Sequence, residues 1–181
     1  TDLYADLDYK IIIKNLTPLY ILTGDSSYSV TGEIRGKIEN KKNIFSFTSN
    51  GKFENLRYRD SVLNISNSRF ALNFIDKNIT NDYKDIFTEM TFSSQRIGVG
   101  KTNFDSVNIY VYTVDTINSF GIKLNLDSTA RLNSDGKIVF LKNEYGIIFD
   151  TLKLGYKNYN LYNRDTLLVR FIPKIDTQTV N

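Results

Sequence analysis

Hydrophobic and polar residues alternate along most of this chain, which is the pattern of β-strands with one apolar and one polar face. Long alternating runs cover 3–13, 28–38 and 120–132, and shorter ones cover 70–74, 152–154 and 167–171. Turn-forming segments separate them at 23–27, 39–43, 58–61, 133–136, 142–146 and 162–165. We therefore predict an all-β protein, an antiparallel sheet of eleven or twelve strands joined by short turns, with little or no helix.

The alternation changes face twice within the segment "GKFENLRYRDSVLNIS", residues 51–66. A β-bulge adds one residue to a strand and so shifts the parity of its side chains. We predict a bulge between Asn55 and Leu56 and a tight turn over 59–61. Phe53 and Tyr58 then lie on the same face of one strand despite their odd spacing.

The segment 78–92 is compatible with two structures. The three- and four-residue spacings from Ile79 to Met90 fit a helix, whereas a strand places Ile86, Thr88, Met90 and Phe92 on one face. We favour a loop or a single helical turn followed by a strand. No composition shift marks a domain boundary, so we expect residues 1–181 to form one β-domain.

Composition excludes several classes of chemistry. The chain contains no cysteine and no histidine, which removes disulfides, thiolate nucleophiles, Ser-His-Asp triads and His- or Cys-ligated metal sites. Its 23 basic and 20 acidic residues are scattered, without the basic stripe on one element that nucleic-acid binding predicts. No apolar run approaches the ~18 residues that a membrane-spanning helix needs.

Three short motifs suggest a site and are better explained as structure. "GVGKT" at 98–102 has Gln95 where a phosphate-binding loop needs its first glycine, and a strand pattern follows it. "NSDG" at 133–136 lacks the ligands of a calcium loop, and we predict a hairpin turn there. Asp6 and Asp8 are expected to share a solvated strand face. No pair of carboxylates stands out, so we predict a protein that is not an enzyme and has no catalytic residue, metal or cofactor.

The cadence of the strands resembles a known family. "GKFENLRYRDSVLNISNSRFALNF" and "LKLGYKNYNLYNRDTLLVRF" are similar to the repeating units of the AsmA-like/TamB proteins of the bacterial envelope, and the resemblance covers roughly residues 28–172. Tyr159 or Tyr162 stands where those units usually carry tryptophan. The resemblance implies an elongated sheet folded lengthwise into an open groove, or β-taco, excised from a longer protein.

The resemblance also implies a function. The parent protein would be anchored in the inner membrane, cross the periplasm, and move phospholipid along the groove or assist outer-membrane protein assembly with a β-barrel partner. Phospholipid acyl chains would contact the concave apolar face, and the end strands of the segment would be open to self-association. The predicted groove residues are Val30, Ile34, Ile38, Phe45, Phe47, Phe53, Phe70, Leu72, Phe74, Ile122, Leu124, Leu126, Ile138, Phe140, Leu152, Leu154, Val169 and Phe171.

A second interpretation uses the same alternation. Strands with one apolar face also close into a β-sandwich, in which that face is simply the core. The protein would then be a non-catalytic adhesion or glycan-binding module that uses exposed tyrosines.

Overall fold

The structure, a computed structural model, describes residues 5–16, 20–21, 24, 26–59, 62–77, 86–114, 117–126, 129–141 and 144–171. Its strands are β1 (Ala5–Ile13), β2 (Tyr28–Lys41), β3 (Ile44–Tyr58), β4 (Leu63–Asp76), β5 (Ile86–Val99), β6 (Thr102–Val114), β7 (Ile117–Leu126), β8 (Ala130–Leu141), β9 (Glu144–Tyr156), β10 (Tyr159–Tyr162) and β11 (Leu167–Phe171).

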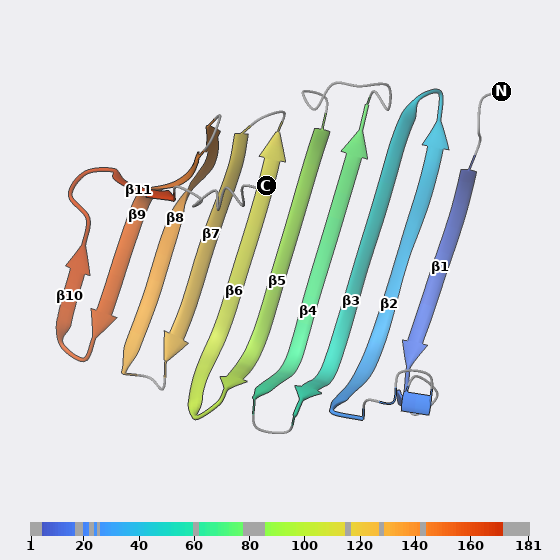
Figure 1. Ribbon diagram of the computed structural model, residues 1–181, viewed down its shortest axis with the longest axis horizontal. Coiled ribbons are helices and arrows are strands. Elements are labelled where there is room, and N and C mark those ends of the chain that lie inside the picture. Colours follow the sequence, from blue (N-terminus) through green and yellow to red (C-terminus); the bar gives the residue numbers. More distant parts are fainter. Residues whose placement is uncertain are drawn as a thin grey trace, which may run out of the picture.

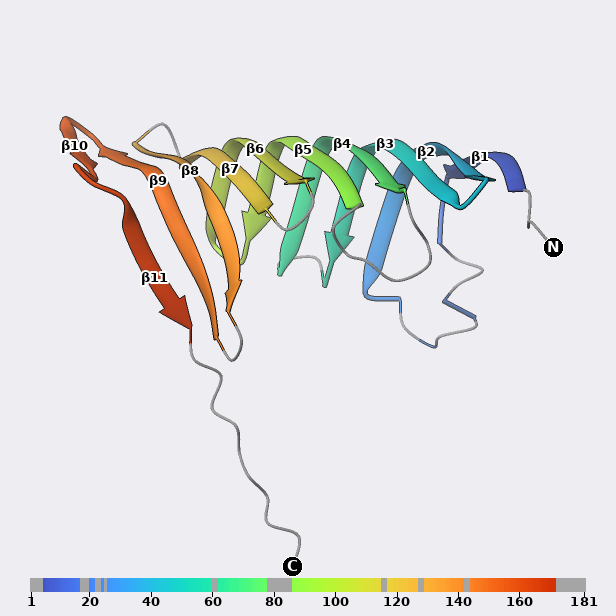
Figure 2. The ribbon, with the colours of Figure 1, turned by 90° about the horizontal axis from the view of Figure 1, so that it is seen from above.

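These strands form one antiparallel sheet in the order of the chain, from β1 at one end to β10 at the other (Figure 1). Strands β10 and β11 both pair with β9, one after the other along the same edge of that strand (Figure 2). The predicted all-β class and the strand number are confirmed. The sheet is open and uncurled, so the lengthwise folding that we expected is not part of this structure.

Two-residue turns explain why neighbouring strands follow each other so closely. Lys42 and Asn43, which join β2 to β3, have φ values of 50° and 64°. Two successive positive φ values are what a hairpin turn matched to strand twist requires. Gly100 and Lys101 form another two-residue connection, between β5 and β6, in which only Gly100 has a positive φ, of 58°. "GVGKT" is therefore a turn between strands.

A line of inserted residues crosses the four central strands. The pairing skips Glu54 of β3, Asn67 of β4, Gln95 of β5 and Ser106 of β6, which lie opposite one another. Asn67 and Ser106 have positive φ values of 48° and 52°. Because each strand gains one residue at the same level, the pairing continues on both sides of the line. We call these four residues the bulge line.

The bulge line accounts for the change of face in the segment 51–66. Gly32 pairs with Phe53 and Tyr28 pairs with Tyr58, and β2 alternates without interruption between them. The prediction that Phe53 and Tyr58 share a face is confirmed. The inserted residue is Glu54, so the bulge lies one residue earlier than we predicted.

Two other local predictions have opposite outcomes. Strand β5 places Ile86, Thr88, Met90 and Phe92 on one face, as predicted, while 78–85 lie outside the described residues. The predicted hairpin turn at "NSDG" is wrong, because these residues lie inside β8. The Phe120 ring covers Gly136 from the neighbouring strand, where a Cβ would come within 3.1 Å of it. This glycine serves close packing and not a turn.

The edge strand at the β9 end is interrupted. Asn163, between β10 and β11, bonds to β9 through its backbone and its side chain. Its N–H donates to the Leu152 carbonyl at 3.1 Å, and its Oδ1 accepts from the Leu152 N–H at 2.7 Å. Its Nδ2 also lies 2.9 Å from the Asp165 carbonyl oxygen, which fixes the bend of the chain there. Strand β1, at the other end, has nine residues and pairs only with β2.

Candidate functional site

One face of the sheet carries apolar side chains on every strand, interspersed with small polar ones such as Ser49, Ser68 and Ser134, and the pairing register places its members. We call it the apolar face and its reverse the polar face. Seventeen of the predicted groove residues lie on it: Val30, Ile34, Ile38, Phe45, Phe47, Phe53, Phe70, Leu72, Phe74, Ile122, Leu124, Leu126, Ile138, Leu152, Leu154, Val169 and Phe171. Phe140 lies in β8 opposite Tyr145, and its side chain is outside the described part of the structure.

The predicted groove residues leave out many members of this face, including all of those on β5 and β6. The register adds Leu7, Tyr9, Ile11, Phe92, Ile97, Phe104, Val107, Ile109, Phe120, Leu132 and Phe149. On β6 the alternation of Ile109 with Val111 was the available signal. Tyr110 and Tyr112 on the opposite face obscured it, since both faces of β6 then read as apolar.

Aromatic rings pack along the apolar face in cross-strand pairs. The ring centroids of Phe53 and Phe70 are 5.7 Å apart and nearly parallel. Further pairs are Tyr9 with Phe47, Phe45 with Phe74, Phe120 with Phe149, and Tyr145 with Phe171, at 5.2 to 6.2 Å. Such pairs contribute about 0.5–1.5 kcal/mol each beyond the area they bury. They fix the register of a sheet that has no second layer in the described structure.

Glycines sit beneath several of these rings. Gly36, Gly32, Gly51 and Gly136 are the direct cross-strand partners of Tyr9, Phe53, Phe70 and Phe120, respectively. In each case an added Cβ would meet the ring of the partner. A ring laid over a strand glycine shields backbone that would otherwise be exposed and pins the register. On the apolar face, large aromatic side chains are therefore paired with glycines, which have no side chain.

Very little of the apolar face is fully buried. Among the described residues, Val107 and Phe120 are the only hydrophobic side chains classed as buried, at 4% and 8% exposure. Leu154 is 44% exposed and Leu161 69% exposed. A closed β-sandwich core would bury these positions under a second sheet. The described strands form a single sheet, so its apolar side chains are covered mainly by their neighbours on the same face. An exception is Tyr28, against which the ring of Tyr20, outside the strands, packs edge-on at 5.7 Å between centroids.

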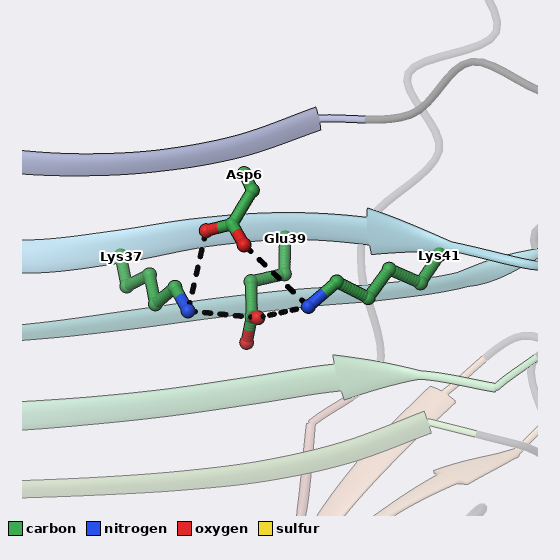
Figure 3. Close-up of polar contacts among 4 residues, drawn as sticks. All are labelled: Asp6, Lys37, Glu39 and Lys41. Carbon is green, nitrogen blue, oxygen red and sulfur yellow. Dashed lines mark hydrogen bonds and ion pairs between the residues drawn. The ribbon is translucent and has the colours of Figure 1, made fainter.

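The polar face is held by ion pairs at its β1 and β2 end (Figure 3). Lys37 and Lys41 both contact Asp6 of β1 and Glu39 of β2 at 2.8 to 3.5 Å. The two ammonium groups lower the pKa of Glu39 to about 2, and the hydrogen bond to Glu39 raises the pKa of Lys37 to about 12. We expected Asp6 to lie on a solvated strand face. Its carboxylate takes part in this ion-pair cluster on the polar face.

A groove of about 1200 Å³ also lies on the polar face, across β1 to β7. Small residues such as Ala71, Thr91 and Gly121 line it together with longer ones such as Arg69 and Tyr110. The Tyr110 hydroxyl donates to Asp135 at 2.8 Å, and this bond raises the pKa of Tyr110. We had expected the hollow of the molecule on the apolar side. Instead, small residues aligned across neighbouring strands leave a groove on the polar face.

No sign of a metal centre or a membrane-spanning element is present in the described residues. They contain no group of three or more acidic side chains that would hold a metal ion. None of their helical segments has the length and apolar character required to cross a bilayer.

Comparisons with protein-family models, with curated proteins and with solved structures found no match to this chain. The resemblance to AsmA-like/TamB proteins therefore stays a prediction.

Proposed function

We propose that the apolar face binds the acyl chains of phospholipid, and that the chain is a non-catalytic segment of a periplasmic, envelope-spanning protein that shields lipid between the two membranes. The observation that carries the proposal is an apolar face that continues over every strand and has no second layer among the described residues. Transport and assistance to outer-membrane protein assembly with a barrel partner belong to the same proposal.

Acyl chains fit such a face because they need a long dry wall and no directional chemistry. The ten strands from β1 to β10 are separated by nine spacings of about 4.8 Å, which give the sheet a length of roughly 43 Å. Each methylene removed from water contributes about 0.8 kcal/mol, so ten of them contribute roughly 8 kcal/mol before the cost of ordering the chain. Contiguous apolar surfaces of this extent on soluble proteins mark binding sites.

The absence of tryptophan from the sequence provides a direct test. We would introduce a single tryptophan as Leu154→Trp on the apolar face, or as Lys153→Trp on the polar face of the same strand. Each variant would be mixed with phospholipid whose acyl chains carry bromine, which quenches tryptophan fluorescence on contact. We expect strong quenching of the first variant and weak quenching of the second.

Equal quenching of both variants, or none of the first, would contradict acyl-chain binding by the apolar face. Mass spectrometry of lipids that copurify with the unmodified protein supplies an independent measurement. Phospholipid recovered in stoichiometric amounts is the expected result, and a lipid-free protein is the contrary one.

A further inference from the structure

The bulge line opens a pocket of about 510 Å³ on the polar face. Its lining is Lys52, Asn67, Arg69, Ser93, Ser94, Gln95, Ser106 and Asn108. Two side chains are cationic, three are amides and three carry hydroxyls. No carboxylate lines this pocket.

The two cations face each other across β3 and β4. Lys52 and Arg69 are direct cross-strand partners. Side chains in this relation lie close together, and like charges so placed destabilise a sheet. Arg69 is opposite Ser93 on its other side, which offers no counter-charge. The structure gives neither cation an ion-pair partner among the described residues.

Other cations on the same face have carboxylate partners. Arg96 pairs with Asp105 at 3.3 Å, and Lys37 and Lys41 share Asp6 and Glu39 (Figure 3). Glu33 is the cross-strand partner of Lys52 on β2, but its carboxylate bonds to Arg35 and Lys10 instead. These bonds lower the pKa of Glu33 and keep it ionised. Among the described residues, Lys52 and Arg69 are therefore cations of this face without an ion-pair partner.

The amide and hydroxyl groups of the pocket add hydrogen-bond donors. Asn67 Nδ2 donates to Gln95 Oε1 at 2.9 Å, which orients the Gln95 amide so that its own Nε2 is free to donate. Ser93 and Ser106 add hydroxyls. An arginine fork, a lysine point charge and neutral donors together match the oxygens of a phosphate group.

We propose that this pocket, formed by Lys52 and Arg69 at the bulge line, binds the phosphate group of a small ligand. The pocket lies on the face opposite the acyl-chain surface, so the proposal is independent of the function proposed above. Free phosphate esters and phospholipid head groups share this chemistry, and the experiment separates them.

The test is a titration of the ¹⁵N-labelled protein followed by amide chemical shifts, with inorganic phosphate and with glycerol 3-phosphate as probes. Sodium chloride at the same ionic strength corrects for screening. We expect saturable shifts around the bulge line with both probes. Lys52→Gln and Arg69→Gln should each raise the dissociation constant at least about fivefold, because each removes one charge-assisted contact to the phosphate. A fivefold rise corresponds to about 1 kcal/mol of binding free energy.

Lys123→Gln is the matched control, because Lys123 lies on the polar face in the larger groove but outside this pocket. It should change the dissociation constant less than about twofold, and Arg69→Lys should retain part of the binding because it keeps the charge. Shifts no larger than those with chloride, or an equal loss in Lys123→Gln, would overturn the proposal. Sedimentation with vesicles of phosphatidylcholine with and without phosphatidic acid identifies the source. Binding to the acidic vesicles without binding to glycerol 3-phosphate would also overturn it, since the membrane surface would then be the ligand.

Discussion

The ring of Phe70 on β4 lies directly over Gly51 on β3, its cross-strand partner on the apolar face. A Cβ at Gly51 would collide with this ring and would come within 3.1 Å of the Glu33 carbonyl oxygen. The same arrangement recurs where Phe120 covers Gly136. The glycines of these strands are thus packing positions, which an open sheet uses in place of a second layer.

Replacing Gly51 with alanine should therefore destabilise the sheet. The added methyl group displaces the Phe70 ring, and overpacking of this kind costs about 1–3 kcal/mol. Gly98→Ala is the control, because the nearest atom there is the flexible end of Asn103 at 3.2 Å. We expect Gly98→Ala to change the free energy of unfolding, measured in urea, by less than about 0.5 kcal/mol. Equal effects of the two substitutions would argue against the ring-over-glycine packing.

Periodicity predicted the strands well where one face is apolar and the other polar. The run 28–38 became β2 with its alternation intact, and the partners of Ile34 and Ile38 follow from antiparallel pairing. The predicted turn at "NSDG" is wrong because the local sequence does not reveal that a ring from another strand covers Gly136. Local composition favours a turn there, and the tertiary contact decides against it.

The sites on the polar face were beyond prediction for a similar reason. Lys52 and Arg69 lie on different strands, and the pairing of β3 with β4, which keeps one register across the bulge line, places them opposite each other at a pocket. A search for basic runs along the chain finds nothing at either position. Neighbours on adjacent strands are set by the register of the strand pair, which the composition of either segment alone does not give.

A charge on the apolar face should weaken lipid binding and leave the sheet folded. Leu124 is only partly buried in the open sheet, so the carboxylate of Leu124→Asp keeps contact with water and avoids the cost of a buried charge. We expect cooperative unfolding with a loss of about 1–2 kcal/mol. Acyl-chain binding, measured by quenching with brominated phospholipid, should fall severalfold. Lys123→Asp, on the neighbouring residue of the reverse face, should leave acyl-chain binding unchanged. A grossly unfolded Leu124→Asp protein would indicate a closed core.

Asn163 should hold the interrupted edge strand in place. Asn163→Ala removes the acceptor for the Leu152 N–H and the donor to the Asp165 carbonyl. Loss of such bonds at a partly buried site costs about 1–3 kcal/mol. Hydrogen exchange measured by mass spectrometry should accelerate in β10 and β11, with β2 to β5 unchanged. Uniform acceleration across all strands would mean that the residue supports global stability instead of this edge.

The acid sensitivity of the β1 and β2 end should depend on Glu39. Because Lys41 and Lys37 lower the pKa of Glu39 from 4.5 to about 2, its ionised form stabilises the folded state. That contribution is complete above pH 4.5 and is lost as the pH falls toward 2. The difference in unfolding midpoint between the wild-type protein and Glu39→Gln should therefore shrink on acidification. Glu89→Gln, which removes a carboxylate without an ion pair in the described structure, should show a smaller difference at neutral pH. A difference that stays constant with pH would exclude the ion-pair origin.

Reversing one charge at the bulge-line pocket should stabilise the protein while abolishing phosphate binding. In Arg69→Glu the new carboxylate faces the Lys52 ammonium group across β3 and β4, and Ser93, its cross-strand partner on β5, carries no charge. Exchanging a like-charge pair for an opposite-charge pair contributes about 0.2–1 kcal/mol, which should raise the thermal midpoint slightly at low salt. Lys123→Glu, opposite Asn108, creates no such pair and should leave the midpoint unchanged. A ligand site accepts a cost in stability to keep its charges unpaired, so opposite responses of stability and phosphate binding are the signature of function at this position. If Arg69→Glu lowered the thermal midpoint, the repulsion between Lys52 and Arg69 would be absent.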